Sequence, residues 1–209
     1  MLMHAAFSLL LSRHSNQDDI VIGTAVANRL QKEVEPMIGF FVNTLVLRSQ
    51  GEDLQSFPAY LQHIKQVNLE AQAHQDIPFE QLVEHLNTPR STRHTPLFQI
   101  MLTLSDNEQD TLTLEGMDFT PMPPETAQAK FDLELDVQID RDGIRLNWLY
   151  DKGLFKRQSI VRLNQHLQTL LSGIATAPQS QLKDLPMLDE QEIHYLRHEL
   201  NQTLSLIHI

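Results

Sequence analysis

The stretch between Phe131 and Tyr150 constrains the fold of this chain more than any other. Apolar and acidic residues alternate along Phe131–Ile139, and a second alternating run covers Ile144–Tyr150. Asp142-Gly143 stands between the two runs, and this pair favours the tight turn of a two-stranded hairpin. Alternation with a period of two places every second side chain on the same face of a sheet. The pattern therefore predicts a β-hairpin with one apolar face in the core.

Further strands and helices are expected around this hairpin. Buried strands are predicted over Ile20–Ala27, Phe40–Arg48 and Phe98–Leu104. The second of these is apolar on both faces, which is typical of a central strand. Apolar residues at helical spacing predict helices over Met1–Arg13, Phe57–Ala71, Pro78–Leu86, Ile160–Ile174 and Asp189–Leu200. Strands and helices mixed in this way, without regular βαβ alternation, predict an α/β sandwich.

The charge balance excludes some classes of partner. The 209 residues include 16 basic and 27 acidic side chains, a formal net charge of −11. An acidic surface disfavours nucleic acid and anionic membranes, because both attract basic stripes. The chain has no cysteine, which suits a reducing cytoplasm. No stretch approaches the roughly 20 apolar residues of a membrane helix, so we expect a cytoplasmic protein without a membrane partner.

Acidic and histidine side chains at regular spacing do not predict a metal site. His194 and His198 are four residues apart on a helix, but no third ligand stands nearby. Asp132, Glu134 and Asp136 share one face of a predicted strand, which is also the ordinary pattern of a solvent-facing sheet. We expect solvated surfaces in both places and no bound metal.

Two polar positions admit a structural and a functional interpretation. Asn43 is a carboxamide within an apolar strand, and a buried amide must find hydrogen-bond partners. Its side chain either holds a neighbouring loop or faces a solvent channel. His74–Asp76 lies between the end of one helix and a proline that begins the next, where side chains often cap backbone groups. The residues alone leave both alternatives open.

Three runs, in this order, resemble motifs of the condensation domains of nonribosomal peptide synthetases. They are Ile38–Arg48 (IGFFVNTLVLR), His74–Glu80 (HQDIPFE) and Arg90–Gln99 (RSTRHTPLFQ). Further segments of the sequence resemble the same family: Asp18–Arg29 before these runs, and Lys130–Leu133, Tyr150-Asp151 and Leu154-Phe155 after them. The resemblance implies one lobe of a chloramphenicol acetyltransferase-like two-layer sandwich, a mixed sheet with packed helices. It is the C-terminal lobe of a domain whose two lobes form a V around a tunnel.

The family's catalytic motif belongs to its first lobe and is missing here. That motif has two adjacent histidines followed by Asp-Gly, whereas no two histidines are adjacent in this chain. The only Asp-Gly is the predicted hairpin turn Asp142-Gly143. The resemblance therefore implies a fragment without catalytic residues, inactive by itself.

The resemblance also implies the reaction and the roles of individual residues. The family joins two thioester-bound aminoacyl or peptidyl groups through an amide bond, and each group is carried on the phosphopantetheine arm of a carrier domain. No cofactor is implied for the chain itself, which would supply tunnel wall and lobe bracing. Asn43 and Thr44 are expected on the tunnel side. The residues expected to brace the lobes or contact the arms are His74, Asp76, Arg90 and Arg93.

Boundaries and partners follow from the same resemblance. Residues 1–174 are expected to form the lobe, and 175–203 a linker and helix leading toward an adenylation domain. The connection Asp106–Gln128, rich in proline, is expected to reach toward the missing N-terminal lobe. The further partners would be the upstream and downstream carrier domains. Residues 204–209 (LSLIHI) match the translation of a transposon-end sequencing adapter and are expected to be a non-native tail.

Two other functions compete with this interpretation. A self-contained acyltransferase of the same superfamily would need a histidine general base, and no histidine here stands in a matching motif. A noncatalytic carrier-binding or epimerisation-type domain is the other alternative. Epimerisation domains usually depart from the FFVNT pattern that Phe40–Thr44 keeps.

Overall fold

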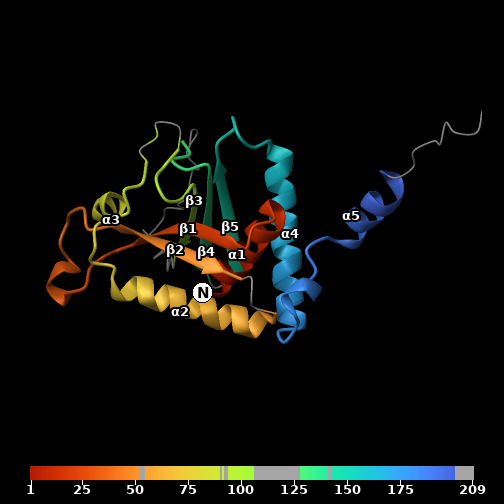
Figure 1. Cartoon of the computed structure of the whole chain (residues 1–209), viewed down its shortest axis with the longest axis horizontal. Helices are drawn as coiled ribbons and strands as arrows, with labels where there is room; N and C mark the ends of the chain where they lie inside the picture. The colour runs from red at the N-terminus through yellow and green to blue at the C-terminus, as the bar shows by residue number, and fades with distance from the viewer. Residues whose placement is uncertain (52–54, 90, 92–93, 106–127, 141–142, 201–209) are drawn as a thin grey trace, which may run out of the picture. The chain divides into compact units, whose positions relative to one another are not determined.

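The computed structural model of the chain describes residues 1–51, 55–89, 91, 94–105, 128–140 and 143–200 (Figure 1). Its contacts define two compact units. One contains the described residues of Met1–Ile20, Ser49–Gln66 and Arg157–Ile209, and the other contains those of Val21–Arg48 and Val67–Lys156. The predictions for Arg90, Arg93, the connection 106–127 and the tail 204–209 lie outside the described residues.

Five strands form one mixed sheet in the order β2-β1-β3-β4-β5 (Figure 1). They are β1 (Asp19–Val26), β2 (Asn43–Gln50), β3 (Ile100–Ser105), β4 (Leu133–Asp140) and β5 (Gly143–Tyr150). β3 pairs in parallel with both β1 and β4, whereas β4 and β5 are antiparallel. The predicted α/β class, a mixed sheet with helices, is confirmed.

The predicted hairpin is confirmed as β4 and β5. Leu133 pairs with Tyr150 at one end and Asp140 with Gly143 at the turn. Gly143 has a φ of 146°, which a side chain would disfavour. Leu133, Leu135 and Val137 are almost completely buried. The alternation of the sequence therefore reports the buried face of β4 correctly.

The position of β2 corrects one expectation. Its sequence is apolar on both faces and predicts a central strand, but β2 lies at the edge of the sheet that the described residues form. It also begins at Asn43, three residues after the predicted start at Phe40. Leu45 and Leu47 are buried as expected, whereas Phe40 and Val42 are exposed. An apolar pattern predicts that a strand will be buried, but it does not show which neighbouring element will cover each face.

Five α-helices agree with the predicted ones. They are α1 (Leu2–Ser15), α2 (Phe57–Ala73), α3 (Phe79–His85), α4 (Arg157–Thr176) and α5 (Glu190–His194), and a π-helical turn (Tyr195–Glu199) follows α5. Short 3-10 turns span Lys32–Val34 and Leu182–Asp184. At the start of α5, Asp189 accepts a hydrogen bond from the Glu192 N–H at 2.7 Å. That bond is the N-cap predicted from the spacing of these two residues.

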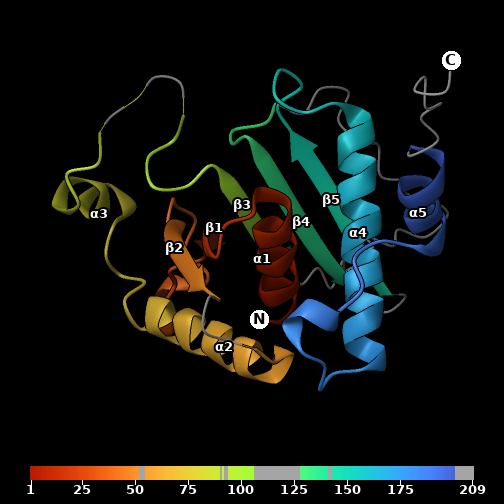
Figure 2. The ribbon, with the colours of Figure 1, turned by 45° about the vertical axis from the view of Figure 1, so that its right-hand side comes forward.

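The first unit has its core around α1 and α4, which pack against each other (Figure 2). All residues of α1 from Met3 to Leu11 are buried. α4 buries the stripe predicted from its helical period, namely Ile160, Leu163, Leu167, Leu170 and Ile174. Such a stripe stabilises a helix mainly through tertiary packing.

The segment after α4 is bonded to the same unit. The Phe57 N–H donates to the Ser180 carbonyl at 2.9 Å, and the Leu182 N–H donates to the Gln55 carbonyl at 2.7 Å. Arg13 donates to the Leu185 carbonyl at 2.8 Å. The segment is therefore held at several points after Thr176, whereas the domain boundary at residue 174 stays a prediction.

Gly23 provides a test of packing in the second unit. A Cβ atom at this position would lie 2.2 Å from Cε2 of Phe98. We expect Gly23→Ala to lower the free energy of unfolding by about 1–3 kcal/mol, because the buried ring must move. Urea unfolding measures this loss. Gly51→Ala is the matched control, since its Cβ would meet Tyr60 at an ordinary 3.4 Å. Equal stability of the two variants would contradict the close contact.

Candidate functional site

The carboxamide of Asn43 makes four hydrogen bonds, all of them to nearby backbone groups. Its Nδ2 donates to the carbonyls of Gln75 at 2.8 Å and Ile77 at 2.7 Å. Its Oδ1 accepts from the N–H of Thr44 at 2.9 Å and of Phe79 at 3.3 Å. Asn43 thus fixes the loop between α2 and α3 to the first residue of β2.

This arrangement also completes the start of α3. Pro78 is the N-cap residue and offers no side-chain hydrogen bond to the helix. The first free N–H of α3, that of Phe79, donates to Asn43 instead, so a residue from another element replaces the local cap. The loop-holding interpretation of Asn43 is supported by these bonds. The tunnel-side position of Asn43 and of half-buried Thr44 stays a prediction.

His74 and Asp76 project from the loop that Asn43 holds. Both are exposed, and neither side chain bonds to another described residue. Simple capping of α3 by these side chains is therefore not observed. Their expected bracing or arm-contact roles stay predictions, as do those of Arg90 and Arg93.

Arg29 organises the segment that precedes β2, and sequence reasoning missed it. Its guanidinium donates to the carbonyls of Glu35 at 3.1 Å and Met37 at 2.8 Å, and also to that of Val34. Its Cζ lies 4.3 Å from the centre of the Phe41 ring, a cation–π geometry. The sequence signal for this role is an arginine that precedes a turn-rich segment and an aromatic run.

Outside this arginine-centred loop lies a ridge of exposed apolar side chains, which we call the apolar ridge: Ile38, Phe40 and Val42. Ile38 and Phe40 have relative exposures of 104% and 94%, and Val42 is half-exposed. Gly39 and Phe41 separate the three in the sequence, and Phe41 is less exposed than they are. Contiguous exposed apolar residues of this kind are typical of interaction surfaces.

Phe98 joins the segments that resemble the family motifs. It is 2% exposed, and its ring centre lies 5.7 Å from that of Phe79 and 5.3 Å from that of Phe131. Gly23 of β1 faces the same ring. Four segments that are separate in the sequence therefore meet at one aromatic side chain, a contact that their spacing does not reveal.

A half-buried carboxylate on the polar face of the sheet is hydrogen-bonded to four neighbouring side chains. Asp136 of β4 accepts hydrogen bonds from Thr103 at 3.0 Å, Ser105 at 2.9 Å, Gln138 at 3.0 Å and Asn147 at 3.3 Å. Burial pushes the pKa of Asp136 upward, but these four hydrogen bonds outweigh it and hold the pKa below the usual value. The predicted solvent-facing acidic strand thus includes an acid whose partners are all neutral.

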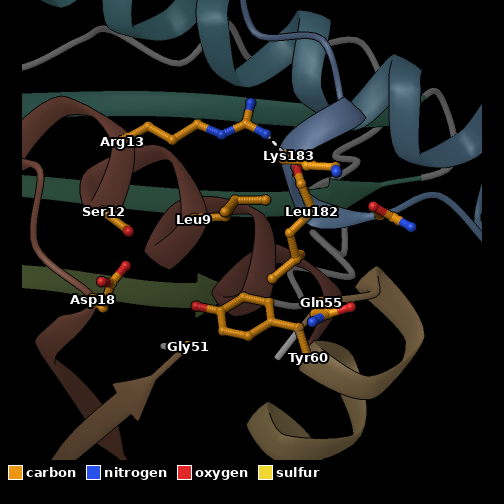
Figure 3. Close-up of a pocket in the computed structure, with 10 residues that line it drawn as sticks. Leu9, Ser12, Arg13, Asp18, Gly51, Gln55, Tyr60, Leu182 and Lys183 are labelled. Carbon is orange, nitrogen blue, oxygen red and sulfur yellow. Dashed lines mark hydrogen bonds between the residues drawn. The ribbon is translucent and has the colours of Figure 1, made fainter. Parts of the chain in front are cut away.

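A separate pocket of about 430 Å³ lies in the first unit (Figure 3). Figure 3 shows Arg13 reaching toward Leu182, to whose carbonyl its guanidinium donates, with Asp18 and Lys183 elsewhere on the wall. Burial raises the pKa of the Tyr60 hydroxyl at this pocket. None of the site residues predicted from the sequence lines the pocket, and its charged side chains define no reaction.

The described residues contain no cluster of three or more histidine or acidic side chains that could hold a metal ion. His194 and His198 lie close together, with ring centres 4.7 Å apart. Within the same part of the chain, no helix combines the length and apolar character needed to span a membrane.

Comparison with known families gives this geometry its context. The sequence model described as "Condensation domain" matches residues 1–196. The chain belongs to the condensation domain family.

Relatives of this condensation-domain chain include peptide synthetases. Tyrocidine synthase 3 of Brevibacillus parabrevis is 37% identical over 205 residues, which are 98% of this chain and 3% of that protein. Surfactin synthase subunit 2 of Bacillus subtilis (strain 168) is 38% identical over 192 residues, 92% of this chain and 5% of that protein. The chain therefore spans a small part of these relatives.

Solved structures show the same fold. The X-domain in its complex with OxyB from teicoplanin biosynthesis has a TM-score of 0.79 and 26% identity, over 90% of this chain and 42% of that one. A holo four-domain nonribosomal peptide synthetase bound to AMP and glycine gives 0.78 and 25%, over 92% of this chain and 16% of that one. The expected chloramphenicol acetyltransferase-like α/β fold is confirmed.

Asn43→Ala should destabilise the condensation-domain chain, because it leaves the Phe79 N–H and the Gln75 and Ile77 carbonyls without their partner. We expect a loss of about 1–3 kcal/mol in the free energy of unfolding, measured by urea unfolding. Gln75→Ala is the matched control, since residue 75 contributes only its carbonyl to this bond. An Asn43→Ala variant as stable as Gln75→Ala would contradict the loop-holding role.

Asp136 predicts a pH dependence. Its lowered pKa means that the folded state prefers the carboxylate, so Asp136 contributes stability above its ordinary value of 3.8 and loses it as the pH falls further. Asp136→Asn should therefore flatten the fall in melting temperature as the pH drops below about 4. Asp132→Asn, whose side chain bonds to no other described residue, is the control. An unchanged slope in Asp136→Asn would contradict the assignment.

Proposed function

We propose that the chain is one lobe of a condensation domain that forms an amide bond between two carrier-bound thioesters. The match of the condensation domain family to residues 1–196 carries this proposal. The acceptor amine attacks the donor thioester carbonyl, so a C–N bond forms and the C–S bond breaks. The acyl group moves to the amine, the amine loses a proton, and the donor arm keeps a free thiol.

The chain itself contributes position and shape to this reaction. It contains no adjacent histidines, so the group that orients or deprotonates the amine lies in the N-terminal lobe. Two reactants held in line on their phosphopantetheine arms react faster because their association entropy is already lost. This lobe forms tunnel wall, with Asn43 and Thr44 on the tunnel side.

Two observations support contact with the N-terminal lobe: the exposed apolar ridge, and the fact that the chain matches only part of a similar solved domain. Ile38 and Phe40 are almost fully exposed, which is costly for apolar side chains in water. The chain covers 42% of the similar X-domain chain, so a domain of that kind has further polypeptide to cover such a surface. His74, Asp76, Arg90 and Arg93 brace the two lobes or contact the carrier arms.

The wider partners are those of a synthetase module. Upstream and downstream carrier domains deliver the two acyl groups, and an adenylation domain follows. The chain binds no cofactor of its own and works in the cytoplasm, since its relatives are peptide synthetases and its surface is acidic.

A noncatalytic binding module is the second candidate. One similar structure is an X-domain in complex with another protein, OxyB. That likeness favours a domain of this fold whose role is to hold a partner protein. A domain of this second kind would bind loaded carriers without forming product.

The two candidates differ in one assay. Purified residues 1–209, offered loaded donor and acceptor carriers, should give no dipeptidyl thioester above background, because the chain lacks the double-histidine motif. The same chain joined to a condensation-domain N-terminal lobe should give product, detected by mass spectrometry. The control replaces the double histidine of that lobe. Product from residues 1–209 alone would contradict the proposal, and binding of carriers without product by the joined protein would favour the binding module.

The joined protein also tests the tunnel-side position of Asn43. If its amide faces the tunnel, Asn43→Ala should lower turnover strongly while the melting temperature changes little. If it only holds the loop, the main effect should be a lower melting temperature. Gln75→Ala again serves as control.

A further inference from the structure

Three side chains from three helices form a hydrogen-bonded line in the first unit. Nε2 of His14, at the end of α1, lies 2.9 Å from Nδ1 of His166 on α4. Nε2 of His166 lies 2.6 Å from Oε2 of Glu192 on α5. His166 is only 3% exposed, and its ring stacks on that of His14 with centres 5.1 Å apart. None of these residues belongs to the motifs that resemble the family.

The chemistry of the groups fixes the direction of the bonds. An ionised Glu192 can only accept, so Nε2 of His166 carries a hydrogen and donates it. A neutral His166 then has Nδ1 as an acceptor, and Nε2 of His14 donates to it. Both nitrogens of a buried imidazole are thereby satisfied, one of them by a charge-assisted bond.

Burial of apolar side chains contributes little to the attachment of α5 among the described residues. Neither α5 nor the π-helical turn after it buries a side chain. Glu192 is fixed twice, because its N–H donates to Asp189 and its carboxylate accepts from His166. A helix of five residues is too short to be stable by itself. Its order must come from tertiary contacts such as this one.

We propose that Glu192, His166 and His14 form a clasp that holds α5 to the α1–α4 pair and opens from the His14 end in acid. The clasp is a property of this chain and does not depend on the proposed amide-forming activity. It fixes the path of the segment after α4, which includes the linker that the sequence predicts. Acid breaks only its bond to α1, because a charged His166 still donates to Glu192.

Protonation affects the two bonds of the clasp differently. One proton can be shared, because a charged His166 donates to Glu192 and to a neutral His14. A second proton makes both facing nitrogens donors and breaks the bond between the rings. The charged and titratable groups that act on His14 are His166 and Arg162 of α4 and Glu192 of α5.

These surroundings set the pH at which the clasp opens. Burial, His166 and Arg162 lower the pKa of His14, and Glu192 partly offsets them. A folded-state pKa below the ordinary value of 6.5 means that the stability from His14 is complete above that pH and is lost as the pH falls below it.

Amide hydrogen exchange by NMR tests the attachment of α5. The reporters are the N–H groups of Ile193 and Tyr195, which donate to the carbonyls of Asp189 and Gln191. Glu192→Ala should speed their exchange at least about tenfold, because a charged hydrogen bond is lost. Glu192→Gln keeps an acceptor without the charge and should restore part of the protection. His194→Ala is the matched control, an exposed residue of the same helix.

The outcomes separate clearly. Unprotected amides in the wild-type chain, or equal exchange in Glu192→Ala and His194→Ala, would overturn the clasp. Adding His166→Ala to Glu192→Ala should speed the reporters no further, since both changes break one bond. For the acid response, His14→Gln should reduce the fall in melting temperature between about pH 7 and pH 5 relative to wild type. An identical fall in both proteins would overturn the opening from the His14 end.

Discussion

The hydrogen bonds of Asn43 are the contacts on which the second unit depends most. One carboxamide connects the first residue of β2 to the Gln75–Phe79 segment and provides the cap that α3 lacks. The N-cap residue is Pro78, whose side chain cannot accept a hydrogen bond from the helix. The aromatic contact of Phe79 with Phe98, and of Phe98 with Phe131, then links this corner to the strands β3 and β4. The motifs shared with the family are thus largely a framework that holds a loop in place.

The same framework carries two exposed features. His74 and Asp76 project from the loop that Asn43 holds, while the apolar ridge continues from the N-terminal end of β2. Arg29 bonds to the carbonyls of Glu35 and Met37, just before the ridge, and lies over the ring of Phe41 between two of its residues. A surface that is both apolar and internally braced suits contact with a second body. In the proposed function that body is the other lobe of the domain.

The first unit depends on different physics. Its α1 is buried along almost its whole length, and α4 adds one apolar stripe, so its core is hydrophobic packing of helices. Polar contacts occur where this core meets the segment after α4. Arg13 holds two carbonyls of that segment, and His166 holds Glu192 of α5. These charge-assisted bonds add direction to a segment that also buries Leu185 in the core.

The sequence by itself determined what depends on neighbours along the chain. Alternation predicted the β4–β5 hairpin, the 3.6-residue period predicted the buried stripe of α4, and the spacing of Asp189 and Glu192 predicted a cap. Ordered motifs were enough to indicate the family. Tertiary structure alone decided the edge position of β2, the partners of Asn43 and the line from His14 to Glu192. These join residues as much as 152 positions apart, and no local pattern encodes which distant groups will meet when apolar surfaces pack.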